Sequence, residues 1–306
     1  MASTTRKPLD YRWAHAVNSH ALLGDVVQEI CEAQQTAFSS KSYVNAIEAD
    51  IIWSDAQQIA VMGHPPQVDG ELSFAAFLDA MQKLARLFTP HEASFGGSMA
   101  DGSRSSSPLI VKLDFKSMQA FRASYEHLRM FIAAFPYAGG VFVNADILVG
   151  PATTSDIAFQ AREFLDAASA LASIDGANAH KLVLSVGWTT SNAIEEEYRR
   201  GYTHEMVDAM LDVLKPYSHL QVTFPIRATS VRNSWEALQK LLTGPRNYGF
   251  TLWWAKTQIP DEELEWLYAT FEEDVQAKHF ADRTFYDILG FERFLQQRFA
   301  STSAST

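Results

Sequence analysis

Short apolar segments alternate with amphipathic segments along nearly the whole chain, and this alternation limits the fold more than any other feature of the sequence. Segments rich in β-branched and other apolar residues are predicted strands: 11–17, 46–53, 59–63, 109–115, 140–148, 181–188, 220–226, 249–255 and 284–289. Between most of them, apolar residues recur at steps of three and four, the period of an amphipathic helix. Strands that alternate with helices indicate a parallel sheet.

The number of strand–helix units points to a closed barrel. Segment 59–63 is predicted to return antiparallel to 46–53 in a hairpin, which leaves eight strands for the parallel sheet. Eight such units in 306 residues fit a single-domain α/β protein with a (β/α)8 TIM barrel. A doubly wound open sheet is the alternative, but no G-x-G-x-x-G or Walker-type glycine loop follows any of these strands.

Polar tracts mark the predicted limits of the domain. Residues 1–10 and 300–306 are small and polar, and both are predicted to be disordered, so the barrel domain is expected to span 11–299. Within it, the tract 89–108 is rich in Gly and Ser and shows no hydrophobic period, which predicts a flexible insertion. Such a loop is either a plain surface connection or a lid over a site.

The charge of the chain limits its partners. There are 25 Lys and Arg against 36 Asp and Glu, a formal net charge of −11. Long nucleic acids and anionic membranes bind basic surfaces, so neither is expected as the main partner. The single cysteine fits a reducing compartment, and neither a signal-peptide core nor an apolar run of ~18 residues is present. We therefore expect a cytoplasmic protein without stable membrane association.

The stretch NAIEADIIW (45–53) places two acids inside a predicted buried strand. Side chains alternate across a strand, so Glu48 and Asp50 point to the same face and repel each other. Asp114, in IVKLDFK, lies on another strand. Three carboxylates without a cysteine favour Mg²⁺, with Ca²⁺ as the alternative ion. The competing interpretation is a structural ion pair with Lys112 or Lys116.

Other polar residues gather near the ends of predicted strands, where a parallel barrel carries its active site. His15 and His64 are candidates for general acid and base, although a lone histidine is more often structural. Lys116 and Arg227 are candidates for binding phosphate oxygens, with a solvated surface cation as the alternative for each. Trp253 is expected either to line the mouth of the barrel or to fill the core.

A last group of polar residues is predicted to contact the substrate or to orient the groups that bind the ion. The sequence does not rank its members: Asn18, Lys112, Asn144 and Asp146.

Several motifs together resemble a known family. WAHAVNS, EADI, GHPP, KLDFK, NADIL, GWTT, TFPIRA and TLWWA occur in this order between residues 11 and 290. In this set and order they closely resemble the menorin family. That family is in turn similar to the phospholipase-C-like phosphodiesterase superfamily, which includes glycerophosphodiester phosphodiesterases and the phospholipase D toxins of spider venom. The resemblance implies a TIM barrel.

The resemblance also implies roles for individual residues. In the superfamily, a His after the first strand and another after the second act as acid and base, and His15 and His64 match them. A Glu-x-Asp pair and a further Asp bind Mg²⁺ there, which match Glu48, Asp50 and Asp114.

In the toxins a Lys two positions past that Asp contacts phosphate, and Lys116 fits it, while Trp253 matches a strand-end Trp. Three departures matter: His-Ala-Val replaces the His-Arg-Gly of the glycerophosphodiesterases, one cysteine cannot form the toxins' disulfide, and 89–108 is an insertion. The substrate cannot be carried over from either branch.

The expected function is that of a metal-dependent phosphodiesterase with two catalytic histidines. A small glycerol or ribose phosphodiester is the expected substrate, including a 2′,3′-cyclic phosphate on a nucleotide or a short nucleic-acid end. Two alternatives stay open: a catalytically silent barrel that binds a ligand or protein, and a phospholipase D-like enzyme acting on lipids. The sequence leaves open the oligomeric state and which histidine is the base.

Overall fold

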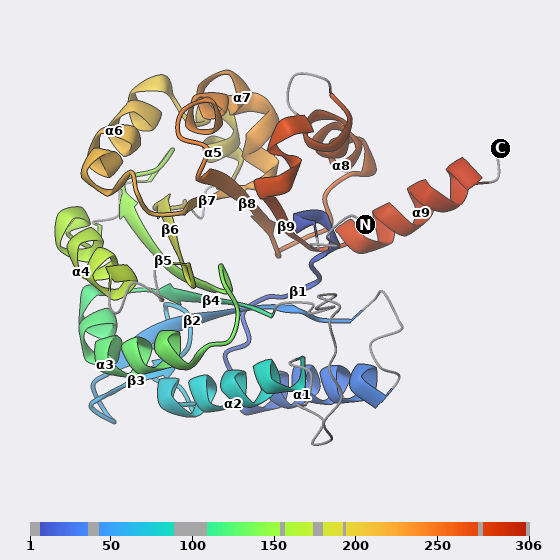
Figure 1. Ribbon diagram of the computed structural model, residues 1–306. Coiled ribbons are helices and arrows are strands. Elements are labelled where there is room, and N and C mark those ends of the chain that lie inside the picture. Colours follow the sequence, from blue (N-terminus) through green and yellow to red (C-terminus); the bar gives the residue numbers. More distant parts are fainter. Residues whose placement is uncertain are drawn as a thin grey trace, which may run out of the picture.

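The computed structural model describes residues 7–35, 43–88, 109–153, 157–173, 180–191, 194–274 and 278–303. Eight parallel strands form a nearly closed barrel, and helices cover its outside (Figure 1). The strands pair in the order β1-β2-β4-β5-β6-β7-β8-β9, and β3 pairs antiparallel with β2. The predicted (β/α)8 barrel and the predicted hairpin are both confirmed.

The strands lie close to their predicted positions, with the first one shorter than expected. Their bounds are β1 Trp13–Ala14, β2 Ala46–Ser54, β3 Ile59–Met62, β4 Ile110–Phe115, β5 Val141–Leu148, β6 Leu182–Trp188, β7 Val222–Arg227, β8 Tyr248–Trp254 and β9 Thr284–Ile288. The paired path ends at β1 and β9, and side chains bridge these two strands. The rings of Tyr11 and Trp13 lie 5.7 and 6.4 Å from that of Phe285.

Helices connect successive strands over the outside of the barrel. Their bounds are α1 His20–Gln35, α2 Phe74–Leu87, α3 Met118–Ala134, α4 Ala161–Ser173, α5 Ile194–Arg200, α6 His204–Leu214, α7 Ala228–Thr243, α8 Asp261–Tyr268 and α9 Phe291–Ser303. Short 3-10 helices span Pro8–Asp10, Lys215–Tyr217 and Lys278–Arg283, and a π-helical turn spans Ala269–Glu273. Ser73 caps the start of α2, because its Oγ accepts a hydrogen bond from the Ala76 N–H.

The ends of the chain and the long insertion are only partly described. Pro8 is buried and α9 continues to Ser303, so ordered structure extends into both predicted tails. Residues 1–6, 304–306 and the whole 89–108 insertion lie outside the described residues.

Strand β2 shows how the alternation of side chains builds the two sides of the barrel wall. Ile47, Ala49 and Ile51 point outward and join the large apolar core between strands and helices. Ala46 points inward and joins a small apolar cluster at the N-terminal end of the barrel. The other buried members of this cluster are Ile110, Phe142 and Val183.

Above this apolar floor the barrel interior becomes polar. The register pairs Glu48 with Lys112 and Asp50 with Asp114 across β2 and β4, and Asp114 with Asn144 across β4 and β5. All these strands run in the same direction, so their polar side chains gather toward one end, the C-terminal mouth.

Candidate metal centre and active site

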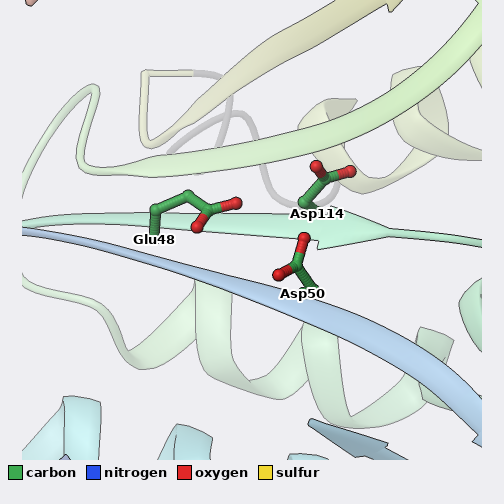
Figure 2. Close-up of side chains that lie close together, drawn as sticks. All are labelled: Glu48, Asp50 and Asp114. Carbon is green, nitrogen blue, oxygen red and sulfur yellow. The ribbon is translucent and has the colours of Figure 1, made fainter. Parts of the chain in front are cut away.

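Three carboxylates converge near the mouth of the barrel. Glu48 and Asp50 extend from β2 and Asp114 extends from β4 (Figure 2). Each offers an oxygen within 4.8 Å of those of the other two. The register explains this convergence, because Asp50 is the direct neighbour of Asp114 and Glu48 lies two residues earlier on the same face. The structure thus brings together the three predicted metal ligands.

Neutral amides orient the two aspartates. Asn18 Nδ2 donates to Asp50 Oδ2 at 2.7 Å, and Asn144 Nδ2 donates to Asp114 Oδ1 at 2.7 Å. Asn144 is held in turn, because its Oδ1 accepts from the Ser185 hydroxyl. In each aspartate one oxygen is fixed and the other is left for a cation, an arrangement common around metal sites. Asn18 and Asn144 are therefore placed to orient carboxylates.

Glu48 lies deeper in the barrel and is not in contact with Lys116. The Ala16 N–H donates to Glu48 Oε2 at 2.8 Å, and Lys112 Nζ lies 4.0 Å from Oε1. Burial and the nearby charge of Asp50 raise the pKa of Glu48 to about 7. Lys112 is itself buried, and its positive charge interacts with the Glu48 carboxylate.

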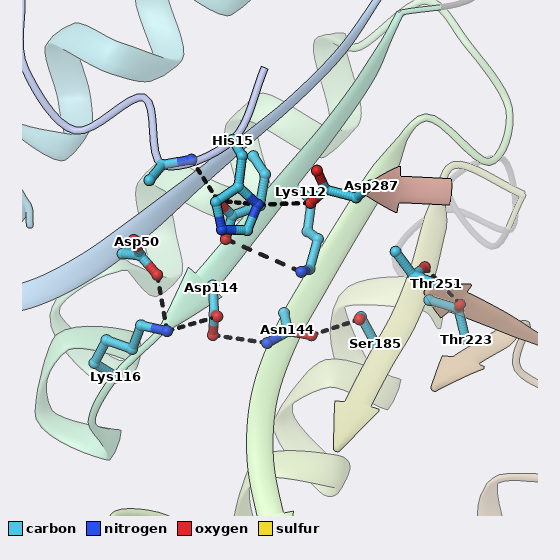
Figure 3. Close-up of polar contacts among 12 residues, drawn as sticks. His15, Asp50, Lys112, Asp114, Lys116, Asn144, Ser185, Thr223, Thr251 and Asp287 are labelled. Carbon is cyan, nitrogen blue, oxygen red and sulfur yellow. Dashed lines mark hydrogen bonds and ion pairs between the residues drawn. The ribbon is translucent and has the colours of Figure 1, made fainter. Parts of the chain in front are cut away.

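Lys116 is the cation closest to the aspartates. Its Nζ lies 2.8 Å from Asp50 Oδ1 and 2.7 Å from Asp114 Oδ2 (Figure 3). Burial by itself would raise the pKa of Asp114, but Lys116 and Lys112 outweigh it and lower that pKa. Burial would lower the pKa of Lys116, but Asp114 and Asp50 outweigh it and raise that pKa.

Asp146, near the end of β5, adds another carboxylate. Burial and the charge of Asp114 raise its pKa to about 7. Among the described residues it has no hydrogen-bond or ion-pair partner. Gly187 on β6 makes room for it, because a Cβ on Gly187 would lie 2.9 Å from Asp146 Oδ1.

The balance of charge in this region fits a divalent cation. Anionic and cationic groups interact here around the mouth of the barrel: Glu48, Asp50, Asp114, Asp146 and Asp287 against Lys112, Lys116 and His15, with Arg227 and its partner Glu197 beside Asp146. With every group ionised, six negative charges face four positive ones. Buried charge without a counter-ion is costly, and oxygen ligands suit Mg²⁺ or Ca²⁺.

His15 follows β1 and is held from three sides. Its Nδ1 donates to Asp287 Oδ2 at 2.7 Å and lies 3.7 Å from Glu48 Oε2 (Figure 3). Its ring stacks on Trp253, with centroids 6.2 Å apart and planes 10° apart. Burial would lower the pKa of His15, but Glu48 and Asp287 outweigh it and raise the pKa to about 9.

His64 lies at the same rim but does not touch the carboxylates. It follows β3 through Gly63, whose N–H donates to the Asp50 carbonyl oxygen at 3.0 Å. The His64 side chain is exposed, and its Nδ1 lies 2.6 Å from the Pro65 carbonyl oxygen of its own loop. The structure therefore places one predicted histidine in the carboxylate network and the other in solvent beside it.

Arg227 is engaged within the protein. Its Nη1 donates to Glu197 Oε2 at 2.6 Å and to the Ser191 carbonyl oxygen at 2.8 Å, and its side chain is buried. The guanidinium carbon lies 5.3 Å from the centre of the Trp253 ring. In this arrangement, the charge predicted to bind phosphate is paired with Glu197.

Two residues of the site were not predicted from the sequence. Asp287 occupies β9 with the same inward alternation as the other strand acids, so the pattern that singled out Asp50 also applied to TFYDIL. Glu197 is the last of three consecutive glutamates in α5, and nothing in that run distinguishes it from its less buried neighbours. Its burial depends on the helix meeting the end of β7.

Comparison with known proteins gives a family match over most of the chain. Residues 8–289 match the Menorin N-terminal domain family. The human protein FAM151B is 27% identical over 293 residues, covering 94% of this chain and 85% of that protein. A solved trimodular endoglucanase of the GH5_4 subfamily has a TM-score of 0.48 at 11% identity, covering 92% of this chain but only 56% of that one.

No helix within the described residues is both long and apolar enough to cross a bilayer. The family match covers the barrel from the 3-10 helix at Pro8–Asp10 to the residue after β9, including every candidate ligand described above. This chain belongs to the menorin family.

Proposed function

We propose that this protein is a metal-dependent phosphodiesterase, related to the phospholipase-C-like superfamily, that acts on a small phosphodiester. The observation that carries the proposal is the convergence of Glu48, Asp50 and Asp114 within 4.8 Å at the mouth of the barrel. Lys116 contacts two of these carboxylates and His15 lies next to the third. A site of this kind combines ligands for a hard cation with a proton carrier and a fixed positive charge.

Glu48, Asp50 and Asp114 would hold the ion, with Mg²⁺ favoured and Ca²⁺ as the alternative. A bound divalent cation supplies neutralisation of the phosphodiester and polarisation of its P–O bond. Asn18 and Asn144 keep two of the carboxylates in place, so Asp50 and Asp114 themselves need little reorganisation when the ion binds.

His15 is proposed as the general acid. Asp287 holds the proton on Nδ1, and the raised pKa means that both ring nitrogens carry protons at neutral pH. Nε2 would then give its proton to the leaving oxygen of the diester. A cation at Glu48 would lower the pKa of His15 toward neutrality and so favour this transfer. His64, exposed on its loop at the same rim, is proposed as the base.

The substrate is proposed to be a glycerol or ribose phosphodiester, including a 2′,3′-cyclic phosphate. An internal hydroxyl next to the phosphate would act as the nucleophile once His64 accepts its proton, and water would do so for a cyclic substrate. Lys116 would bind a phosphate oxygen. The net charge of −11 favours a short nucleic-acid end over a long strand, because a long polyanion is repelled.

The proposal is tested by turnover of defined diesters. Purified protein in Mg²⁺ is incubated with bis(p-nitrophenyl) phosphate, glycerophosphodiesters and 2′,3′-cyclic nucleotides, and products are identified by mass spectrometry. We expect hydrolysis that EDTA abolishes. His15→Ala and His64→Ala should each lower kcat by about 10²-fold or more, the usual contribution of general acid–base catalysis.

His127→Ala is the matched control, because His127 is an exposed histidine on the outside of helix α3. It should leave turnover unchanged. If the protein binds Mg²⁺ but turns over no diester of the panel, the silent barrel that binds a ligand replaces the enzyme. Full activity in either His15→Ala or His64→Ala would remove that residue from the mechanism.

A further inference from the structure

The Lys116 ammonium group contacts one oxygen of Asp50 and one oxygen of Asp114, two of the candidate metal ligands. Asp50 Oδ2 and Asp114 Oδ1 accept from asparagine side chains, whereas Asp50 Oδ1 and Asp114 Oδ2 contact Lys116 Nζ at 2.8 and 2.7 Å (Figure 3). Lys116 thus lies against the oxygens that remain for a metal ion.

We propose that Lys116 is an internal cation that competes with the metal ion for Asp50 and Asp114, and that moves to bind the substrate phosphate when the ion enters. The inference rests on the metal centre of the proposed function. It makes Lys116 a residue that sets the metal affinity, in addition to its expected contact with phosphate.

It is unfavourable for both cations to share these oxygens. Mg²⁺ requires its oxygen ligands at about 2.1 Å in near-octahedral geometry. An ammonium held by the same two oxygens would lie a few ångströms from the ion, and two positive charges at that distance repel strongly in a buried site. Entry of the ion therefore favours the departure of Lys116 from Asp50 and Asp114.

The structure gives Lys116 room to move. It is the first residue after β4, and its side chain is 19% exposed. Lys112, in the middle of the same strand, is 4% exposed and has no such freedom. The displaced Lys116 would have another carboxylate to pair with. Asp146 attracts Lys116 and has no ion-pair or hydrogen-bond partner among the described residues.

The consequence is an ordered site. Without the ion, Lys116 neutralises the aspartates and cannot contact phosphate. It therefore does not help to bind the negatively charged substrate at the mouth of the barrel. With the ion bound, the same lysine is released toward the mouth beside Asp146, where a phosphate oxygen can accept from it. A monovalent ion brings too little charge to replace an ammonium with two carboxylate contacts, which favours divalent ions.

The test is calorimetric titration of Mg²⁺ into the metal-free protein, its Lys116→Met variant and its Lys112→Met variant. Both variants remove one positive charge from the site, but only Lys116→Met frees the two oxygens. We expect Lys116→Met to bind Mg²⁺ about tenfold or more tightly than the unaltered protein, and more tightly than Lys112→Met. Lys116→Gln, which keeps polarity without charge, should behave like Lys116→Met.

Urea unfolding of the same proteins shows that the variants are folded and gives a second readout. Metal-free Lys116→Met should be less stable than the unaltered protein, and saturating Mg²⁺ should restore more stability to it than to the unaltered protein. Equal or weaker Mg²⁺ binding by Lys116→Met and Lys116→Gln, with binding intact in the unaltered protein, overturns this inference alone. If none of the proteins binds Mg²⁺ or Ca²⁺, this inference and the metal centre both fail.

Discussion

The hydrogen bond between His15 and Asp287 shows how one side chain sets the orientation and protonation of another. Asp287 Oδ2 accepts a hydrogen bond from the His15 Nδ1–H, which orients the ring and leaves Nε2–H for the substrate. Stacking on Trp253 fixes the plane of the ring. The same contact spans the two ends of the sheet, because His15 follows β1 and Asp287 belongs to β9. The hydrogen bond that holds the proposed general acid thus also joins the two ends of the sheet.

Asp287→Asn should lower the pKa of His15 from about 9, because the substitution removes one of the two negative charges that raise it. NMR titration of the His15 ring in metal-free protein measures this change. Turnover should fall roughly 10–100-fold, as expected when the partner that orients a functional histidine is lost, with its pH profile displaced in the same direction. Asp282→Asn, an exposed acid preceding β9, is the control. An unchanged His15 pKa in Asp287→Asn would contradict the assigned role.

A small buried cluster of hydrogen-bonded polar groups joins helix α5 to the end of β7. Glu197 Oε2 accepts from the Ser191 N–H at 2.7 Å and from Arg227 Nη1 at 2.6 Å. Arg227 Nη1 also donates to the Ser191 carbonyl oxygen, which closes the cluster. The guanidinium lies over Trp253, the residue that stacks on His15. The helix therefore supports the aromatic wall of the site through Arg227.

Glu197→Gln should lower the free energy of unfolding by about 3 kcal/mol, because it leaves the charge of Arg227 buried without its carboxylate partner. Denaturant unfolding measures the change. Glu196→Gln is the matched control, since Glu196 pairs with Arg200 on the surface of the same helix and such pairs contribute about 1 kcal/mol or less. The double variant Glu197→Gln/Arg227→Met should regain much of the loss. A double variant less stable than Glu197→Gln would argue against the buried pair.

The barrel as a whole encloses more acid than base. Glu48 and Asp146 are buried among like charges, and the pKa of each is raised to about 7. In the unfolded chain both carboxyls return to ordinary values near 4, so between about pH 4 and 7 the folded state binds more protons than the unfolded state. Stability therefore falls as pH rises through this range. His15, with its pKa raised to about 9, adds a further loss between about pH 6.5 and 9.

Metal-free protein should lose stability from pH 5 to pH 8, the reverse of the usual behaviour of acidic groups in salt bridges. Each raised carboxyl accounts for on the order of 3 kcal/mol at most, at 1.36 kcal/mol per pKa unit. Urea unfolding in EDTA at several pH values measures the loss, and Mg²⁺ should reduce it by balancing the ionised carboxylates. Glu48→Gln should flatten the profile between about pH 4.5 and 7. Stability that rises over this range in EDTA would refute the charge imbalance.

Much of the fold could be read from local patterns. Period-two and period-3.6 runs of apolar residues located the strands and the hairpin, because each depends on residues close in sequence. The shared face of Glu48 and Asp50 follows from the same alternation. Their meeting with Asp114 needed one further step, the pairing of strands that are neighbours in a parallel barrel.

The remaining features depend on contacts between elements far apart in the chain. Asp287 reaches His15 because the last strand lies beside the first, and Glu197 takes Arg227 because α5 folds back onto β7. Lys116 contacts Asp114 two residues away, but it meets Asp50 only because β4 pairs with β2. The periodicity of a sequence sets which face a residue occupies. Which partner it meets there is decided by packing, because the free energy of a buried charge depends on every neighbour that the fold brings within a few ångströms.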